Sequence, residues 1–273
     1  MEIKYFGYDI FYGKYFLHSK FKSVYNYTDN NSIVSIVNSE IGKGPNNIVI
    51  DDFPDKAENE VIITSKKLII GKESFKIDKS KNDAKIYLRN KDQLKNVIEL
   101  ILNNINFEEK SLGFILFPEE EKYFKSTFEI AFVRKVKEIL NDFTFENLPT
   151  FAKNMKGLGF GLTPSGDDFN CGVLYALHYL KNISNIDSTE TIYRYFSNAI
   201  GNNLISNTFI MQAYKNNYYK NFQNLLIALD DGENEKIIYY RDEVLASGHS
   251  SGSDMLAGFI FCLNSFYQGG LND

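Results

Sequence analysis

The stretch that decides the fold is Leu-Thr-Pro-Ser-Gly-Asp-Asp-Phe-Asn-Cys-Gly, from Leu162 to Gly172. A second stretch, Gly-His-Ser-Ser-Gly-Ser-Asp-Met-Leu-Ala-Gly from Gly248 to Gly258, repeats its pattern. Aligned, the two copies share Ser-Gly-x-Asp-x-x-x-Gly. Each copy leads into an apolar run, so each is expected to begin a helix. We therefore expect a helical region built around two related helix starts.

The spacing Ser-x-x-Asp is typical of a capping box. In that arrangement the hydroxyl of Ser165 or Ser251 accepts the amide three residues on, and the aspartate at that position reaches back to the capping residue. The last glycine of each copy lies on the same helix face as its aspartate. Two helices crossing at Gly172 and Gly258 would explain both copies by packing alone.

The first copy is preceded by Lys156-Gly157-Leu158-Gly159-Phe160-Gly161. Three alternate glycines allow unusual backbone dihedrals and expose successive amides just before a helix, where anions bind well. Lys153 or Lys156 could supplement these donors. The string lacks the Gly-Lys-Ser/Thr ending of a Walker loop and does not follow a strand, as a dinucleotide fingerprint would. The residues expected to bind a phosphate or carboxylate are Gly159, Gly161, Thr163, Ser165, Gly166, Asp167, Ser251 and Gly252, with Lys43 from a separate loop.

One aspartate from each copy forms the candidate catalytic pair, Asp168 with Asp254. If they are close and buried, one pKa should rise or a cation such as Mg²⁺ should bind, which suits acid/base or metal chemistry. Asp167 would point about 100° away from Asp168 on the same helix. His249, in the second copy, is the third candidate for proton transfer, with an exposed loop histidine as the alternative. Arg194 and Asn198, Asn202 and Asn203 could add donors, or form a solvated helix face.

Residues 1–90 read as a β-rich domain with a mostly antiparallel sheet, because short apolar segments alternate with turn signals. The loop from Gly42 to Pro45 could hold an anion through its amides and Lys43, or simply connect two strands. The expected strands are Phe11 to Leu17, Ser32 to Val37, Asn47 to Ile50, Glu60 to Thr64, Lys67 to Ile70 and Lys85 to Leu88.

Beyond residue 90 the apolar period lengthens to that of helices. Residues 91–147 are expected as a mixed connecting region, with a helix over Asp92 to Asn104, a buried strand over Gly113 to Phe117 and a long helix over Pro118 to Leu140. That long helix would carry Phe124, Phe128, Ala131 and Phe132 on one side. Residues 148–273 are expected as a helical domain carrying both motifs, so the fold class is α+β. Its expected helices are one into Lys153, one from the first motif to Lys181, Thr189 to Ile200, Asn203 to Asn216, Tyr218 to Leu229, Glu233 to Ala246, and one from the second motif to Phe266.

Composition excludes several classes of function. The chain has 273 residues, a net charge of -5 and a pI near 5.4, which argues against nucleic acid or an anionic membrane as a partner. It has no apolar run long enough to span a bilayer. Cys171 and Cys262 are expected as buried free thiols, in keeping with a cytoplasmic setting. The sequence requires no cofactor, although Mg²⁺ is compatible with the aspartate pair.

The string Gly159-Phe160-Gly161-Leu162-Thr163-Pro164-Ser165-Gly166-Asp167-Asp168-Phe169, followed by Gly172, resembles the AllH family, which is associated with the oxamate carbamoyltransferase of bacterial allantoin degradation. The motif from Gly248 to Gly258 and the loop from Gly42 to Pro45 also have similar counterparts there. The resemblance implies a transferase subunit in purine catabolism. With companion subunits it would move a carbamoyl group between oxalurate and phosphate, giving oxamate and carbamoyl phosphate. The chain lacks the Ser-Thr-Arg-Thr signature of ordinary carbamoyltransferases, so its site must be built differently.

Three functions remain open from the sequence. In the first, the chain is an AllH-like carbamoyltransferase subunit that binds a small anion (carbamoyl phosphate, oxamate, oxalurate or phosphate) between the motifs. This subunit would be active only with the companion subunits of a carbamoyltransferase complex. In the second, it is a Mg²⁺-dependent nucleotide-binding or phosphotransfer protein in which Asp168 and Asp254 hold the metal. In the third, it is a non-catalytic assembly subunit whose motifs only pack two helices.

Overall fold

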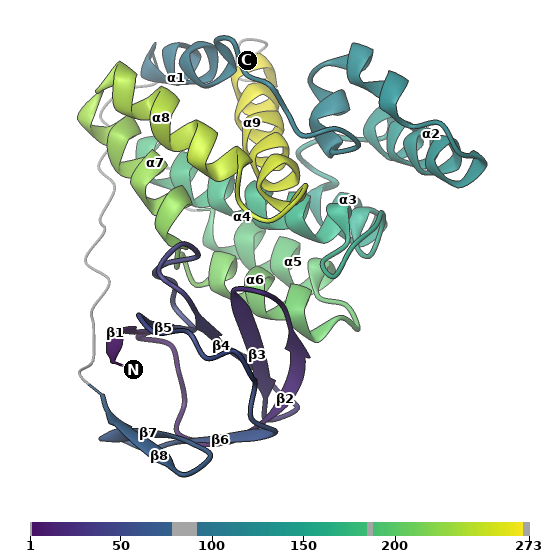
Figure 1. Cartoon of the computed structure of the whole chain (residues 1–273). Helices are drawn as coiled ribbons and strands as arrows, with labels where there is room; N and C mark the ends of the chain where they lie inside the picture. The colour runs from purple at the N-terminus through teal and green to yellow at the C-terminus, as the bar shows by residue number, and fades with distance from the viewer. Residues whose placement is uncertain (1, 78–91, 185–187, 270–273) are drawn as a thin grey trace. The chain divides into compact units, whose positions relative to one another are not determined.

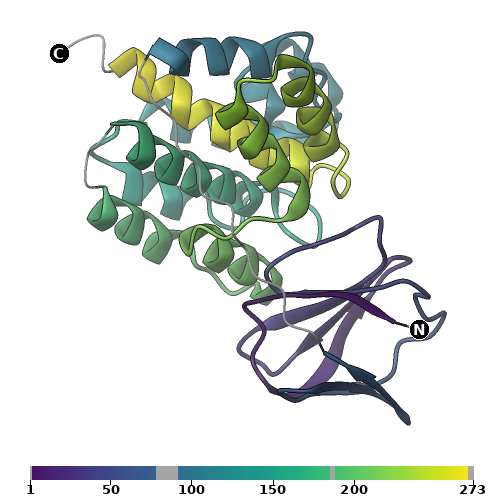
Figure 2. The same cartoon turned by 90° about the vertical axis from the view of Figure 1, so that its left-hand side faces the viewer.

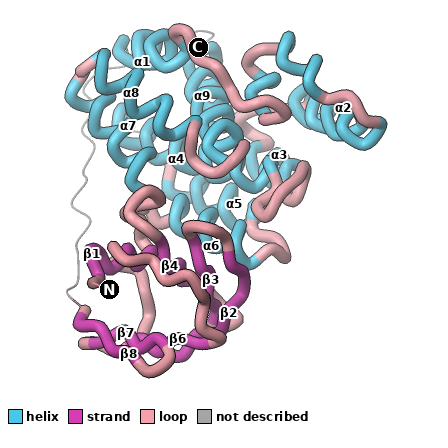
Figure 3. The backbone as a smooth tube through the Cα atoms, in the orientation of Figure 1, coloured by secondary structure: helices cyan, strands magenta, loops and turns pink. Residues whose placement is uncertain are grey.

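The computed structural model describes residues 2–77, 92–184 and 188–269. They form two compact units. One contains the described residues up to 77 together with Asn217–Lys220, and the other contains the remaining described residues. Strands make up the first unit and helices the second (Figure 3). The predicted α+β class is therefore confirmed.

The first unit is an eight-stranded sheet within the described residues, in the order β1-β5-β4-β3-β2-β6-β7-β8. Neighbouring strands are antiparallel except β4 and β5, which are parallel. The mostly antiparallel sheet expected from the sequence is confirmed. The strands are β1 (Ile3–Phe6), β2 (Gly13–Lys20), β3 (Val24–Thr28), β4 (Ile33–Val37), β5 (Asn47–Ile50), β6 (Glu60–Ile63), β7 (Lys67–Ile70) and β8 (Glu73–Lys76).

The core of this sheet forms because apolar side chains on alternate residues of a strand point to the same buried face. In β6, Val61 and Ile63 are buried while Glu60 and Ile62 face outward, as expected for a half-buried strand. The strands β4 and β5 are buried along their whole length, so both of their faces are covered. A second, smaller apolar cluster of Tyr5, Val37 and Val49 lies apart from the main core.

The sequence missed three strands, β1, β3 and β8. In β3 the pattern Val-Tyr-Asn-Tyr-Thr contains a polar residue that interrupts the apolar signal. Asn26 is nevertheless buried, because its amide donates to the Ser19 hydroxyl at 3.0 Å and its carbonyl accepts the Ser35 hydroxyl at 2.7 Å. The predicted strand from Phe11 begins two residues later, and the predicted strand over 85–88 lies outside the described residues.

The loop from Gly42 to Pro45 contacts the segment Asn217–Lys220 in the same unit. The amide of Lys220 donates to the carbonyl of Lys43 at 2.9 Å. A Cβ at Gly44 would lie 2.5 Å from the ring of Tyr219, closer than real contacts allow. Packing against this segment therefore accounts for a glycine in the loop without any bound anion.

In the helical unit, α4 (Ser165–Ser184) and α9 (Ser251–Gly269) pack against each other. Most of α4 is buried, and so are most residues of α9 up to Leu263. Figures 1 and 2 show α9, in yellow, lying among the other helices of this unit. None of the helices in the described ranges is long and apolar enough to cross a bilayer. The remaining helices are α1 (Asp92–Leu102), α2 (Thr127–Asn141), α3 (Leu148–Met155), α5 (Thr189–Ala199), α6 (Leu204–Tyr214), α7 (Lys220–Asp231) and α8 (Asn234–Leu245).

Two expectations for residues 91–147 are wrong. The apolar run over Gly113 to Phe117 is not a strand but contributes to a short 3-10 helix, η1 (Leu112–Ile115), whose Ser111 hydroxyl accepts the Gly113 amide at 3.2 Å. A five-residue apolar run cannot distinguish a strand from a buried helical turn. The residues of η1 belong to the helical unit.

The expected long helix over Pro118 to Leu140 is also wrong, because it is broken. A 3-10 helix, η2 (Pro118–Tyr123), ends before α2, which begins after a full capping box of Ser126 and Glu129. The break changes the buried face as well. Phe128 is 67% exposed, and the buried side chains of α2 are Phe132, Val133, Val136 and Ile139.

Candidate functional site

The two motif helices cross at the last glycine of each copy. A Cβ at Gly172 would lie 1.9 Å from the carbonyl oxygen of Met255, and a Cβ at Gly258 would lie 2.2 Å from that of Phe169. Met255 and Phe169 occupy the same position in their respective copies, so the contact is reciprocal. The close approach predicted from the sequence is confirmed.

The earlier glycine of each motif packs against the preceding helix. A Cβ at Gly166 would lie 2.0 Å from the carbonyl oxygen of Met155, at the end of α3. A Cβ at Gly252 would lie 1.8 Å from that of Val244, in the last turn of α8. The pairs α3–α4 and α8–α9 are therefore two copies of one helical hairpin, and these two glycines have a packing role.

The motif serine of each copy lies near the aspartate of the other copy. Burial raises the pKa of both aspartates; the Ser251 hydroxyl opposes that rise at Asp168, and the Ser165 and Ser250 hydroxyls oppose it at Asp254. The expected capping boxes are wrong, because the amides of both aspartates bond to backbone carbonyls four residues earlier. Thr163 joins the two copies, since its hydroxyl donates to Asp168 Oδ2 at 2.8 Å and lies 3.1 Å from the Ser251 hydroxyl.

Both aspartates of the pair are buried, with 3% of Asp168 and 0% of Asp254 exposed. Burial, followed by the charge of Asp254, raises the pKa of Asp168 well above its ordinary value. Burial also raises the pKa of Asp254 to about 6, although hydrogen bonds oppose the change. Each carboxyl group therefore keeps its proton to a higher pH than an exposed aspartate does, because burial disfavours its charge. Oδ2 of Asp254 makes no hydrogen bond of regular geometry to a described residue.

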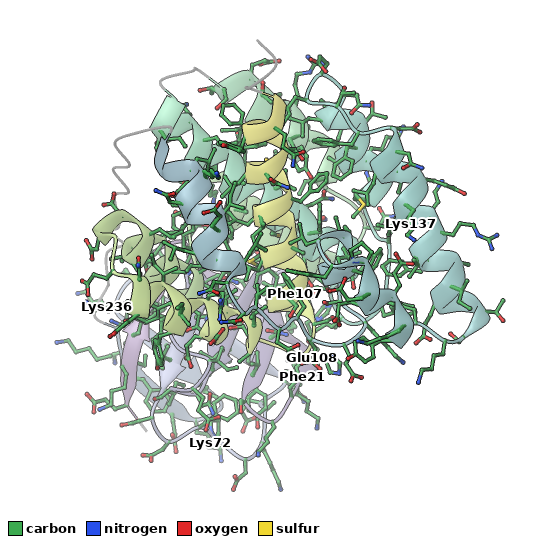
Figure 4. All side chains as sticks on the ribbon, turned by 90° about the horizontal axis from the view of Figure 1, so that it is seen from above. Phe21, Lys72, Phe107, Glu108, Lys137 and Lys236 are labelled. Atoms are coloured by element: carbon green, nitrogen blue, oxygen red, sulfur yellow. The ribbon has the colours of Figure 1, made fainter. Side chains whose placement is uncertain are left out.

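The second copy also anchors a distant segment of the chain. Asp254 Oδ1 accepts the amide of Leu112 at 2.6 Å, and the Ser253 hydroxyl accepts the amide of Glu108 at 3.0 Å. In Figure 4 the labelled Phe107 and Glu108 lie next to α9. These bonds give the buried polar residues of the second copy a structural role.

The first copy carries a loop that the second lacks, between α3 and α4. Gly157, Gly159 and Gly161 all have positive φ, at +71°, +104° and +93°, as the alternate glycines predicted. The amide of Gly157 donates to Asp167 Oδ1 at 2.7 Å. By contrast, no amide from Gly159 to Thr163 donates a hydrogen bond to any residue that the structure describes. This run of uncommitted donors directly precedes the N-terminus of α4.

The other predicted site residues are placed separately. His249 is exposed and lies in the loop before α9, where its charge lowers the pKa of Asp254. Lys43 belongs to the sheet unit, where its ammonium lies 5.6 Å from the centre of the Tyr5 ring. Across the described ranges, no group of three or more His, Cys, Asp or Glu side chains is arranged to hold a metal ion. Cys171 and Cys262 are free and buried, as expected.

Sequence reasoning undervalued two residues. Asn203 caps α6, because its carbonyl accepts the amides of Ile205 and Ser206, and its amide donates to the Leu162 carbonyl at 2.7 Å. Ser253 was not singled out, because it occupies a position at which the two copies differ. Its alignment with Asp167 could have pointed to it, since both side chains accept a backbone amide.

Fold and site together define an α+β protein whose helical unit pairs two copies of one helix-start motif, the first extended by a glycine loop. A family model described as "Oxamate carbamoyltransferase subunit AllH" matches residues 155–263, and one described as "AllH family N-terminal domain" matches residues 4–85. The chain belongs to the AllH family. Searches of curated proteins and of solved structures each find no significant match.

Proposed function

We propose that the chain is a subunit of an oxamate carbamoyltransferase and binds its small anionic substrate at the loop between α3 and α4. The proposal is supported by the family's name, which denotes such a subunit. In this reaction phosphate attacks the carbamoyl carbon of oxalurate, the bond from that carbon to the oxamate nitrogen breaks, and carbamoyl phosphate forms. The proton lost by hydrogenphosphate passes to the leaving nitrogen. Companion subunits would complete the active complex.

The uncommitted amides from Gly159 to Thr163 carry the proposal. Successive amides in a loop with positive φ form a concave donor surface, and the N-terminus of the following helix adds a positive partial charge. The Thr163 hydroxyl adds a polar group, and the loop residues are partly or fully exposed and so accessible. A phosphate or a small carboxylate fits this donor set.

These donors would act at two stages. They would hold the phosphate, and they would stabilise the negative charge that develops on the carbamoyl oxygen. The pKa of each carboxyl group of the buried pair Asp168 and Asp254 is raised, and Thr163 bonds to Asp168 from the loop. Proton transfer would therefore run through Thr163, or through the exposed imidazole of His249.

A second candidate, a non-catalytic assembly subunit, is favoured by one observation. The reciprocal glycine contacts, and the bonds of Thr163 to Asp168 and Ser251, tie α4 to α9 without a ligand. On that alternative the motifs only build the helical unit, and the chemistry lies in a companion subunit.

Two matched glycine variants test the proposal. Gly161→Ala disturbs a loop glycine with φ of +93°, whereas Gly232→Ala disturbs a glycine with φ of +70° between α7 and α8. Both should cost on the order of 1 to 2 kcal/mol of stability, because a Cβ strains a positive φ. Calorimetry with phosphate, carbamoyl phosphate, oxamate and oxalurate would be done on the chain alone and on its complex with companion subunits.

We expect Gly161→Ala to weaken anion binding about tenfold or more, which corresponds to about 1.4 kcal/mol, and Gly232→Ala to leave it unchanged. Absence of binding to any of the four anions, even in the complex, would refute the anion site. If Gly161→Ala binds as the wild type does and the complex turns over normally, the assembly role is the better account.

A further inference from the structure

Asp167 is a buried carboxylate beneath the glycine loop, with 4% of its surface exposed. Its Oδ1 accepts the amide of Gly157 at 2.7 Å. Burial raises its pKa, while the Gly157 amide, the Ser206 hydroxyl and the charge of Lys156 oppose that rise. A carboxylate in this position occupies a loop amide itself and would repel a second anion, so direct contact with substrate is not its role.

Adjacent aspartates hold the two ends of the loop. Asp167 bonds to Gly157 at the beginning, and Asp168 bonds to Thr163 at the end. Two bonds between the loop and the segment around α5 and α6 support the same conformation. Lys156 donates to the Ile200 carbonyl at 2.9 Å, and Asn203 donates to the Leu162 carbonyl at 2.7 Å.

Between these fixed ends, the amides from Gly159 to Thr163 stay uncommitted. A loop that is already ordered loses less conformational entropy when it binds a ligand. The hydrogen bonds at the two ends therefore hold the central amides in place before a ligand binds.

The second hairpin supplies an internal comparison. Ser253 occupies the position of Asp167 and also accepts a backbone amide, that of Glu108. The alternate glycines of the first copy are missing there, since only Ala246 to Ser250, with the single glycine Gly248, separate α8 from α9. In the second copy a neutral hydroxyl is enough to accept the backbone amide. In the first copy a carboxylate accepts it, and this charge-assisted hydrogen bond is stronger.

We infer that Asp167 is a positioning residue, an internal anion that holds the glycine loop in the conformation in which its central amides can receive a substrate anion. The inference rests on the proposed function. It assigns Asp167 a role through Gly157 and not through contact with the substrate.

The test compares Asp167→Ala, Asp167→Asn and the matched control Ser253→Ala. Binding of phosphate and carbamoyl phosphate is measured by calorimetry in the complex with companion subunits, and amide hydrogen exchange is followed from Gly157 to Thr163. Asp167→Ala should weaken binding about tenfold and accelerate exchange at Gly157, because the acceptor is gone. Asp167→Asn keeps an acceptor oxygen and should restore affinity to within about threefold of wild type.

Ser253→Ala should accelerate exchange at Glu108 while leaving anion affinity within about twofold of wild type. Affinity in Asp167→Ala equal to or tighter than wild type would overturn the inference and leave the anion site intact, since it would show that the carboxylate only repels. Equal losses in Asp167→Ala and Ser253→Ala would also overturn it. A wild-type complex that binds neither anion would instead refute the proposed function and the role of Asp167 with it.

Discussion

The free energy of unfolding of the wild type should fall by about 3 kcal/mol as pH rises, because Asp254 must ionise while buried. Replacement of Asp254 by Asn should remove this loss. Burial raises the pKa of this carboxyl group from 3.8 to about 6. A shift of about 2 units, at about 1.4 kcal/mol per unit, corresponds to that free energy. Because the folded state binds this proton more tightly than the unfolded state, the stabilisation is complete below pH 3.8 and is lost as pH rises through about 6.

The Asn side chain matches the site in shape. Its carbonyl can still accept the Leu112 amide, which lies 2.6 Å from Asp254 Oδ1. Its amide replaces Oδ2, an atom without a hydrogen bond of regular geometry to the described residues. That amide can donate toward the neighbouring acidic and hydroxyl groups of Asp168 and Ser165, so the variant should fold.

The assay is denaturant unfolding of both proteins from pH 4 to pH 8, followed by helical circular dichroism. The stability of Asp254→Asn relative to wild type should increase by about 3 kcal/mol across this range. Glu243→Gln, which removes an exposed carboxylate on α8, is the control and should change by less than about 0.5 kcal/mol. A flat difference for Asp254→Asn, or one that falls as pH rises, would refute the reasoning.

Two further predictions concern close packing. Gly172→Ala and Gly258→Ala should each lower the free energy of unfolding by about 1 to 3 kcal/mol or prevent folding, because each Cβ would meet backbone across the helix crossing; denaturant unfolding measures this, and a cost below that of Gly232→Ala would contradict it. Gly44→Ala should destabilise the sheet unit through its collision with Tyr219, and the cost should shrink in a Tyr219→Ala background. Additive costs in that double-mutant cycle would show that the collision is relieved elsewhere.

Regular apolar periodicity and clear turn residues allowed several strands and helices to be predicted from the sequence. The glycine and proline turns separated β4 from β5 and β5 from β6 correctly, and Asp230-Asp231-Gly232 separated α7 from α8. Errors arose where one local signal supports two structures. The five-residue apolar run from Gly113 is compatible with a strand or a helix. Gly113 packs against the ring of Phe107, which leaves no room for a larger side chain at position 113.

The break before α2 shows a different limit. The apolar residues from Phe124 to Phe132 fit a helical period, yet Phe124 lies before the cap and is buried with Phe132, their ring centres 5.9 Å apart. The Ser126 and Glu129 spacing that starts α2 was present in the sequence. It was overlooked because Pro118 and the glutamates after it gave an earlier, equally plausible start.

The sequence by itself determined that two related helix starts would face each other at small residues, and that the loop before the first could adopt dihedrals closed to other residues. Both follow from properties of glycine that hold wherever it occurs. Only the tertiary structure decided that Thr163 joins Asp168 to Ser251 of the other copy, that Asp167 accepts the amide of Gly157, and which loop amides donate no hydrogen bond. Those outcomes depend on which helix lies nearest in space, and a hydrogen bond is made by the nearest well-oriented partner, whatever its distance along the chain.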